Sequence, residues 1–446
     1  MQGKVSILNV SPEAAAMIAS GGRISTMDGT AGEIYAKSLS AGQEKNEKLI
    51  GKVLSSGHTS VLEHCYVNLS FENVSVLAEQ FLIEFRLASF TVKSRRYVDF
   101  SKAGYVFPDF RDDAQRAIFE NTVQSLFCTY DALEAAGVPK EDARFVLPYC
   151  FCSNFFCSMN ARELVHVMNE LTYGRGSRIP ELRALGKSLF AQCEQKLPFL
   201  TVRKPEAYRQ PDAVCPRPVQ LLTSKAPVTV LAAPQDAEGL ICGAYQLARG
   251  YVPQPLTESE QTALLKSLLA QPRKRELEQA SYTLLFGGLS LAALTHLTRH
   301  RMQALCAPEL LKTAHYDRYV LPESVRQAGM EAQYRSAFQM AGEAAAQLRT
   351  AGAGEDVLPY LLLSGQTVPV LTTMNAGELY VFFRLRCCNR AQWEIREAAS
   401  AALAALRKTS PLLFSLYGPT CFVSGKCPEG KMTCGRQAEI RKIFSE

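Results

Sequence analysis

The apolar and polar positions of the chain predict the same succession of elements twice. Residues 5–8 (Val-Ser-Ile-Leu) have the pattern of a short strand, and Ser11-Pro12-Glu13 then predicts the N-cap and first turn of a helix. Residues 228–231 (Val-Thr-Val-Leu), followed by Ala-Pro-Gln-Asp, open the second half in the same way. A repeat with so long a period indicates duplicated domains and not a solenoid.

Within each half, a strand-like segment leads into a helix-like one. The strand-like segments are Cys65 to Phe71 and Ala280 to Phe286, and the helix-like segments are Val74 to Arg86 and Leu289 to Arg301. A later helix, expected at 160–171 and at 375–386, follows an apolar Val-Leu-Pro in both halves. We therefore expect two tandem α+β domains.

Pairs of identical residues fix the period of the repeat. The spacing is 215 positions for Glu63 and Glu278, Phe71 and Phe286, Arg86 and Arg301, and Asn160 and Asn375. A constant offset at separated points is strong evidence for duplication. We expect a first copy at residues 1–215 and a second at 216–446, with a proline-rich linker at 200–228. We expect that the chain can be cut in this linker without exposing core.

Composition narrows the class of protein. The 446 residues are 47% hydrophobic and 21% charged, which is ordinary for a globular protein of two to three domains. No apolar run reaches the roughly 18 residues of a membrane span, and no secretory signal pattern opens the chain. Fourteen cysteines in such a chain predict reduced thiols and a cytoplasmic protein that does not bind membranes. The net charge of +6 suits an anionic small molecule, and no basic tract interleaved with aromatics favours nucleic acid.

Arg299-His300-Arg301 at the polar end of an apolar run is the most unusual local chemistry. Such a triplet alone is more often a solvated helix face. The motifs that follow the triplet change this interpretation. They are Arg318-Tyr319, Asn375 and Leu385-Arg386, in that order. The order resembles the flavin-dependent thymidylate synthases, whose signature is an Arg-His-Arg, a serine-containing loop ending in Arg-Tyr, and a later helix with Asn-Ala-Arg and Leu-Arg.

The first half is similar to the same family through different residues. Residues 57–64 (Gly-His-Thr-Ser-Val-Leu-Glu-His) resemble the family's Gly-His-x-Ser-x-x-Glu-His, and residues 87–98 resemble its substrate loop. Glu84-Phe85-Arg86 stands where the Arg-His-Arg would be, and Leu171 stands where the Leu-Arg arginine would be.

The second half has lost the motifs that the first retains. Its substrate loop is seven residues longer, Tyr316 replaces the serine, and Glu355 replaces the arginine before Val-Leu-Pro. Gly377 replaces the arginine of Asn-Ala-Arg, and 273–275 (Arg-Lys-Arg) replaces Gly-His-x-Ser. The family assembles its site across subunits, so complementary losses predict a covalent pseudo-dimer with one composite site. The competing interpretation is that both copies are decaying and the remaining arginines are structural.

The resemblance implies a role for each retained residue. Arg386 would be the catalytic arginine. The implied substrate-binding residues are Ser94, Arg96, Arg144, His296 and Arg299. The implied cofactor-binding residues are His58, Ser60, Glu63, Asn160, Arg162, His166, Arg299, His300 and Arg301. No Gly-x-Gly-x-x-Gly follows a strand, so a Rossmann-type FAD site is not expected.

The implied reaction is FAD-dependent reductive methylation of dUMP to dTMP, with methylenetetrahydrofolate as carbon donor and NADPH as reductant. The implied assembly is a homodimer that forms a pseudo-tetramer. A non-catalytic flavin- or nucleotide-binding pseudoenzyme and a related pyrimidine C-methylation are the alternatives.

The C-terminal tail contains Cys421, Cys427 and Cys434, separated by five and six residues. Three thiols are one short of a structural zinc set, which Cys387 or Cys388 would complete. A tail of reduced thiols is the favoured interpretation, and we assign no metal to the site.

Overall fold

A computed structural model describes residues 3–200, 202–209, 226–309 and 315–445. Most of the expected linker at 200–228 lies outside these ranges, as does the part of the lengthened second loop at 310–314. Within the described part of the chain, no helix is long and apolar enough to cross a membrane.

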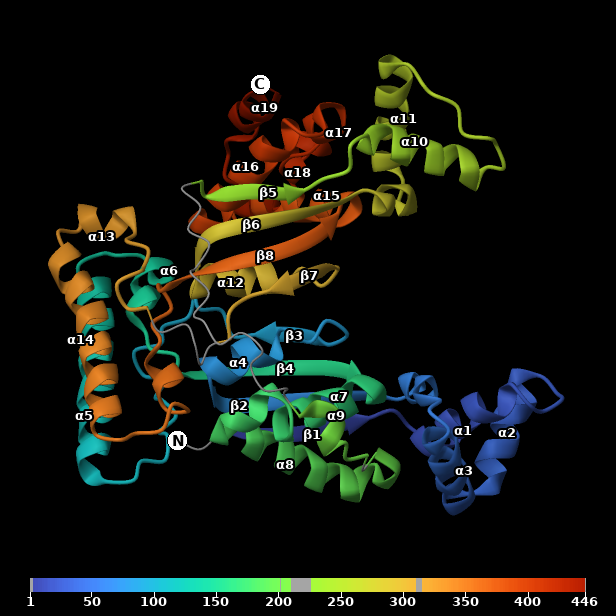
Figure 1. Cartoon of the computed structure of the whole chain (residues 1–446), viewed down its shortest axis with the longest axis horizontal. Helices are drawn as coiled ribbons and strands as arrows, with labels where there is room; N and C mark the ends of the chain where they lie inside the picture. Colours follow the sequence, from blue (N-terminus) through green and yellow to red (C-terminus); the bar gives the residue numbers. More distant parts are fainter. Residues whose placement is uncertain (1–2, 201, 210–225, 310–314, 446) are drawn as a thin grey trace. The chain divides into compact units, whose positions relative to one another are not determined.

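Each half contains one four-stranded antiparallel sheet (Figure 1). The first sheet has the order β1 (Lys4–Val10), β2 (Tyr66–Ser75), β4 (Cys152–Asn160) and β3 (Ser89–Val92). The second has the order β5 (Val228–Ala232), β6 (Ser281–Ser290), β8 (Thr367–Asn375) and β7 (Gln303–Cys306). The two sheets have the same topology, which confirms the prediction of an α+β chain with two similar halves.

The register of the central strands repeats as well. The pairing of β2 with β4 shifts between Phe71 and Val74, and that of β6 with β8 shifts between Phe286 and Leu289. Both irregularities fall at the same place of the 215-residue repeat. A β-bulge re-aims the residues that follow it, so both sheets turn their chain into the next helix in the same way.

The helices after these strands begin at repeated serine caps. Ser75 opens α4 (Val76–Leu82), and Ser290 opens α12 (Leu291–Thr298). A glutamate accepts hydrogen bonds from the amide and hydroxyl of each serine, the partly buried Glu181 in the first half and the buried Glu394 in the second. Both helices are shorter than predicted, because β2 and β6 extend to the caps, and the Arg-His-Arg triplet begins at the C-cap of α12.

The first expected cap is wrong. Helix α1 (Ala14–Ile24) has Glu13 at its N-cap, in a left-handed conformation with φ 51° and without a capping side chain. Ser11 is occupied elsewhere, since its hydroxyl accepts a hydrogen bond from the Tyr66 amide at 2.9 Å. The serine therefore extends the pairing at the start of β2 instead of opening the helix.

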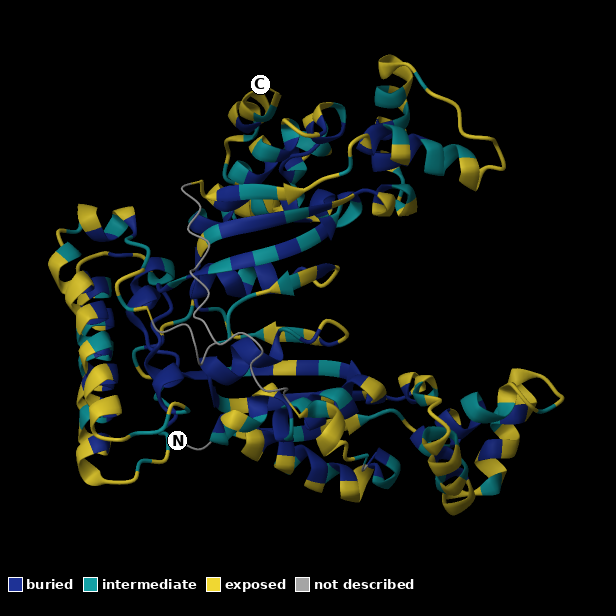
Figure 2. Cartoon of the chain, in the orientation of Figure 1, coloured by how far each residue is buried: buried dark blue, intermediate teal, exposed yellow. Residues whose placement is uncertain are grey.

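The later helix of each half begins where the repeat predicted, and an asparagine caps it. Asn160 caps α7 (Ala161–Thr172), and Asn375 caps α15 (Ala376–Arg386). In the first half, α7 and α8 (Pro180–Lys196) pack against the sheet. In the second half, α15 and α16 (Trp393–Arg407) have this position. Figure 2 shows that the central strands β2, β4 and β6 are largely buried, whereas the edge strands β3 and β7 are largely intermediate or exposed.

The remaining helices lie outside these layers. They are α2 (Ala31–Ala41), α3 (Gln43–Ser55), α5 (Asp113–Ala135), α6 (Lys140–Ala143), α9 (Pro205–Tyr208), α10 (Ala237–Ala248), α11 (Glu258–Ala270), α13 (Glu323–Gln327), α14 (Glu331–Thr350), α17 (Pro411–Ser415), α18 (Thr420–Val423) and α19 (Gln437–Ser445).

The compact units of the structure divide the chain differently from the sequence copies. One unit comprises residues 1–217 and 321–364, and the other comprises 218–320 and 365–446. In the first unit, α14 packs against its counterpart α5. Gln115 donates a hydrogen bond to the Ala351 carbonyl at 2.8 Å, and Tyr149 donates its amide proton to the Leu362 carbonyl at 2.7 Å. A helical segment of the second copy thus completes the core of the unit that holds the first copy.

Candidate functional site

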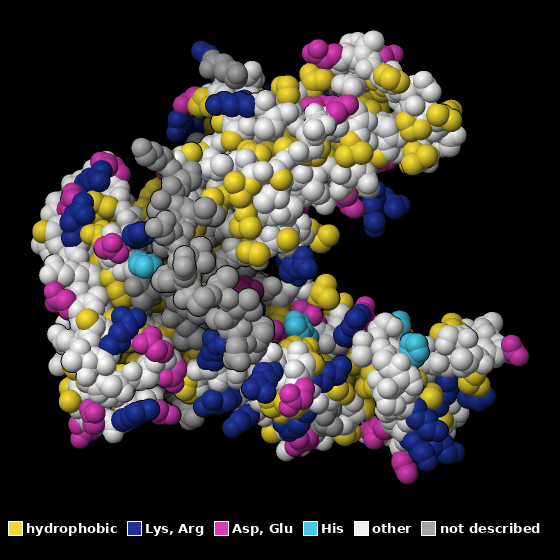
Figure 3. Space-filling view, in the orientation of Figure 1, with side chains coloured by type: hydrophobic (Ala, Val, Ile, Leu, Met, Phe, Trp, Pro, Cys, Tyr) yellow, Lys and Arg dark blue, Asp and Glu magenta, His cyan; other side chains and the backbone are white. Residues whose placement is uncertain are grey.

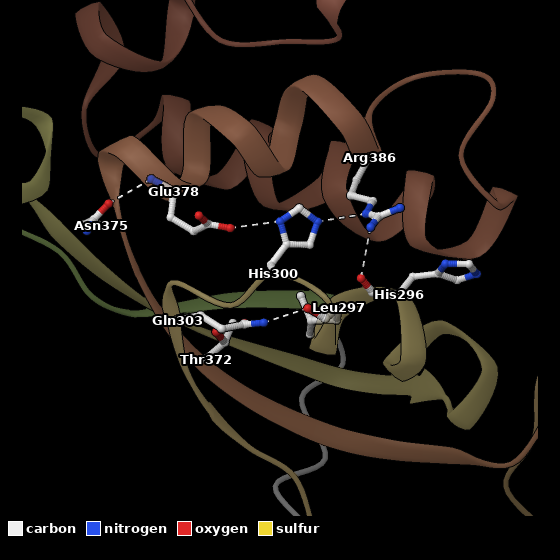
Figure 4. A network of polar contacts seen from close by, with 8 residues as sticks. All are labelled: His296, Leu297, His300, Gln303, Thr372, Asn375, Glu378 and Arg386. Carbon is white, nitrogen blue, oxygen red and sulfur yellow. Dashed lines mark hydrogen bonds and ion pairs between the residues drawn. The ribbon is translucent and has the colours of Figure 1, made fainter. Parts of the chain in front are cut away.

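A polar network joins the end of α12 to α15 in the second unit. His300 lies two residues beyond α12 and is 5% exposed. Its Nδ1 lies 2.9 Å from Glu378 Oε1, and Arg386 Nε donates to its Nε2 at 2.9 Å. Arg386 Nη2 also donates to the His296 carbonyl at 3.2 Å (Figure 4). Two hydrogen bonds from separate nitrogens therefore fix the plane of the Arg386 guanidinium.

The chemistry of the two neighbours specifies the protonation state of His300. An ionised carboxylate only accepts hydrogen bonds, and a guanidinium only donates them. The contacts are therefore compatible with a neutral imidazole that carries its proton on Nδ1. Burial lowers the pKa of His300 from its usual range, and the nearby Arg386 charge lowers it further, against the opposing hydrogen bond to Glu378. The imidazole is accordingly neutral near neutral pH.

The surrounding elements hold this network in place. Asn375 Oδ1 accepts the Glu378 amide at 2.8 Å, which fixes the first turn of α15. Gln303 donates to the Leu297 carbonyl at 2.7 Å and accepts from the Thr372 hydroxyl at 2.6 Å. These bonds tie β7 and β8 to the last turn of α12 (Figure 4). Sequence reasoning missed Glu378, although its place three residues after Asn375 repeats that of Glu163 after Asn160.

The flanking arginines differ from Arg386 in exposure. Arg299 and Arg301 are exposed, and Met302 beside them is 68% exposed. Exposed guanidiniums can reorient toward an anion at a small cost in desolvation. On the face in Figure 3, Lys and Arg side chains are interspersed with Asp and Glu. No broad basic surface is therefore seen among the described residues on this face.

The first copy has lost this network at the equivalent positions. Phe85 and Leu171 replace the imidazole and the guanidinium, and both are buried. Glu163 remains at the position of Glu378, and burial raises the pKa of its carboxyl. Glu84 replaces Arg299 and pairs with Arg175 at 3.3 Å. Apolar and acidic groups thus replace Arg299, His300 and Arg386, while Arg86 keeps the place of Arg301.

The residues expected to bind phosphate cluster around Glu141 in the first unit. Arg96 Nε forms an ion pair with the Glu141 carboxylate at 2.7 Å. Arg144 is buried, and its Nε donates to the Glu141 carbonyl at 3.1 Å. Ser94 Oγ accepts the Arg96 amide at 3.3 Å. The structure therefore brings Ser94, Arg96 and Arg144 together.

A buried ion pair anchors the same loop. Arg95 Nη2 lies 2.6 Å from Glu79 Oε1, and both side chains are buried. Ser153 donates to the other oxygen of Glu79 at 2.5 Å. Breaking a buried pair leaves an uncompensated charge, which is strongly destabilising. Arg95 was missed by the sequence reasoning, and a lone glutamate in the apolar run 76–83 was the available signal.

The first-unit residues expected to bind the cofactor lie near the start of α7. His58 precedes the short helix Thr59–His64, and His58 and Ser60 are exposed. Glu63 on that helix pairs with Arg162 at 2.6 Å. Farther along α7, His166 Nδ1 lies 2.8 Å from the Tyr208 hydroxyl.

Asn160 uses its side-chain oxygen to cap α7, so its side chain has a structural role at the start of this helix. Exposed imidazole, hydroxyl and guanidinium groups fit the diphosphate of a dinucleotide by the chemistry of their donors.

The structure groups the sequence-predicted residues into two sets. The first unit holds His58, Ser60, Glu63, Ser94, Arg96, Arg144, Asn160, Arg162 and His166, and the second holds His296, Arg299, His300, Arg301 and Arg386.

The cysteine tail lies beside the turn after α15. Arg390 donates its amide proton to Cys388 Sγ at 3.5 Å, and Asn389 lies 3.9 Å from Cys434 Sγ. Burial raises the pKa of Cys421, and the charges of neighbouring cysteines add to the effect. Among the described residues, no three His, Cys, Asp or Glu side chains are arranged to hold a metal ion.

Comparison with protein families gives a match in each half of the chain. The family described as "Thymidylate synthase complementing protein" matches residues 6–199 and 229–412. Two separate segments, each with its own match, agree with the repeated sheets.

Individual proteins are similar over less than half of the chain. A flavin-dependent thymidylate synthase of Geobacter sulfurreducens is 36% identical over 197 residues, which cover 43% of this chain and 84% of that protein. A flavin-dependent thymidylate synthase of Clostridium tetani is 31% identical over 208 residues, covering 42% of this chain and 83% of that protein. The crystal structure of a UMP/dUMP methylase PolB from Streptomyces cacaoi bound with 5-Br dUMP is 21% identical, with a TM-score of 0.37 over 45% of this chain and 93% of that chain.

Proposed function

Because the chain belongs to the thymidylate synthase complementing protein family, with both halves matched, we propose that it is an FAD-dependent thymidylate synthase. It converts dUMP to dTMP with methylenetetrahydrofolate as carbon donor and NADPH as reductant. The observation that carries the proposal is the guanidinium of Arg386, held by hydrogen bonds to His300 and to the His296 carbonyl. Decay without function would not preserve this arrangement while its counterpart becomes Phe85 and Leu171.

Ser94, Arg96 and Arg144 bind the phosphate of the nucleotide. Guanidiniums pair with phosphate oxygens through a planar fork of donors, and a hydroxyl fixes the register. Glu141, which pairs with Arg96 at 2.7 Å, holds this guanidinium until the more highly charged phosphate replaces it. His296 and Arg299 are the further contacts to the nucleotide.

Arg386 acts on the uracil ring. A guanidinium beside the ring carbonyl and N–H stabilises the negative charge that develops when carbon 5 is methylated. FAD, when bound, supplies the hydride and carries the one-carbon unit. No cysteine nucleophile is required, and the described buried thiols fit that assignment because burial raises the pKa of Cys150 and Cys387.

The cofactor is held by cations and small polar groups. The residues assigned to it are His58, Ser60, Glu63, Asn160, Arg162, His166, Arg299, His300 and Arg301. His300 has both ring nitrogens engaged, to Glu378 and Arg386, so it contributes by holding its neighbours.

Each copy supplies the residues that the other has lost. We therefore assign one site to each chain, a homodimer as the assembly, and the cytoplasm as the location. The support for a shared site is the complementary pattern of retained residues: Arg96 and Arg144 in the first copy, Arg299 and Arg386 in the second.

Complementation of a thymidine auxotroph tests the proposal. The wild-type chain should restore growth without thymidine, and Arg386→Ala should not. Failure of the wild-type chain to complement, with no dTMP formed by the purified flavoprotein, would refute it. A colourless protein that still binds dUMP would establish the non-catalytic alternative, and methylation of another pyrimidine would establish the related C-methylation.

A further inference from the structure

Glu378 has no role in the assignments above, although it is part of the Arg386 network. We propose that Glu378 is a positioning residue that orients the Arg386 guanidinium through His300. This inference rests on the proposed function, because it takes Arg386 as the catalytic arginine.

Each hydrogen bond of the network has a defined donor and acceptor. The Glu378 carboxylate accepts from His300 Nδ1 at 2.9 Å, and His300 Nε2 accepts from Arg386 Nε at 2.9 Å. A carboxylate cannot donate and a guanidinium cannot accept, so both ends select the same imidazole tautomer. Replacing the carboxylate with an amide removes the selection at Nδ1, because an amide both donates and accepts, and leaves the guanidinium alone to favour this tautomer. His300 would then present an N–H to Arg386 in part of the molecules, which breaks the bond to Nε.

Glu378 is well placed to hold the imidazole. Its side chain is 10% exposed and that of His300 is 4% exposed, so water competes little with their contact. The Glu378 backbone is fixed by the Asn375 cap at 2.8 Å. Phe382 and the imidazole pack in a T-shaped arrangement, with ring centroids 5.0 Å apart. A carboxylate in the first helical turn is also favoured by the helix dipole.

The first copy supplies a control within the same chain. Glu163 occupies the equivalent position behind Asn160 and is buried, but the counterparts of His300 and Arg386 in the first copy are Phe85 and Leu171. The charges that act on the Glu163 carboxyl are instead those of His166, Arg162 and Arg86. Any purely structural contribution of a buried glutamate at this helix position is shared by Glu163 and Glu378. A contribution to turnover is expected of Glu378 alone.

Glu378→Gln in the full chain is the test, with Glu163→Gln as the matched control. We expect Glu378→Gln to lower kcat on the order of 100-fold, as a misplacement of about 1 Å in a reacting geometry does. The dissociation constant for dUMP should change less than about threefold, because the phosphate contacts are intact. Glu163→Gln should leave kcat unchanged, and the two variants should lose similar amounts of thermal stability.

Coupling to His300 distinguishes positioning from a separate effect. In a His300→Phe background, Glu378→Gln should cause no further loss of kcat, because residues that act as a unit are non-additive. An equal loss in both backgrounds would overturn the proposal, as would wild-type kcat in the single variant.

A readout without turnover separates this inference from the proposed function. The chain has six histidines, so ¹⁵N NMR of labelled histidine can be assigned by substitution. Wild-type His300 should show the Nδ1–H tautomer, and Glu378→Gln should show a mixture. If the tautomer shifts as expected but no dTMP forms in any variant, the synthase assignment fails and with it the catalytic meaning of the network. If the tautomer is unchanged, the positioning role is refuted whatever the activity.

Discussion

Replacing Arg386 with alanine should abolish turnover while leaving the protein folded. The arginine donates to His300 at 2.9 Å and to the His296 carbonyl at 3.2 Å, and its removal leaves a buried imidazole nitrogen without its donor. Such an orphaned acceptor costs about 1–3 kcal/mol of stability. Removing a preorganised donor from a developing negative charge costs about 2.7–4 kcal/mol of activation free energy, or about 10²–10³ in kcat.

The expected loss of stability is too small to account for the expected loss of kcat. A domain with about 5 kcal/mol of stability that loses 3 kcal/mol still has only about 3% of its molecules unfolded. Unfolding therefore cannot produce a loss of activity on the order of 100-fold. Formation of dTMP at saturating dUMP, measured beside a thermal melt, gives both quantities. Arg386→Lys keeps the charge without the planar fork and should also be impaired. An activity loss that matches the unfolded fraction would show that Arg386 is structural.

The remaining predictions concern binding and pH. Arg96→Ala and Arg144→Ala should each weaken dUMP binding by about 1.5–3 kcal/mol per charged hydrogen bond lost, and unchanged affinity by calorimetry in both variants would refute the phosphate site. The folded state lowers the pKa of His300, so it binds fewer protons there than the unfolded state. The resulting stability is present above the unfolded pKa of about 6.5 and is lost as pH falls toward the folded pKa. Denaturant unfolding should therefore show wild-type stability declining below about pH 6.5 more steeply than that of His300→Phe, and parallel curves would contradict the neutral imidazole. The acid limb of kcat should move to lower pH in Glu378→Gln, because that variant removes the bond that raises the His300 pKa.

The sequence predicted the repeated elements because their signals are local. Alternating apolar residues in 65–71 and 280–286 and the asparagines at 160 and 375 define strands and helix starts within a few positions. The retained Arg386 and the lost Leu171 counterpart were likewise visible from the offset alone. Glu378 was not, since a glutamate near a helix start has an ordinary explanation as a favourable charge at the dipole.

The sequence did not predict which helices pack together in one compact unit. The amphipathic pattern of helix α14 predicts that its apolar face is buried, but it does not indicate which helix covers that face. In the structure α14 packs against α5. Our sequence interpretation treated the linker as a place where the copies separate without exposing core. That expectation is wrong, because Tyr334 and Phe338 of α14 and Phe119 and Val123 of α5 are buried in one compact unit. Isolated copies would expose these faces, so tests of a shared site belong in the intact chain.

The number of sites per chain tests the central claim most directly. Purified full-length protein should be yellow and should bind one FAD, and the FAD-loaded protein should bind one dUMP per chain by calorimetry. Arg96→Ala in the first copy and Arg386→Ala in the second should each impair that single site, with no turnover remaining from another. Two equivalents of nucleotide and flavin per chain, or activity that survives either substitution at about half the wild-type level, would show that each copy has its own site and would contradict the account.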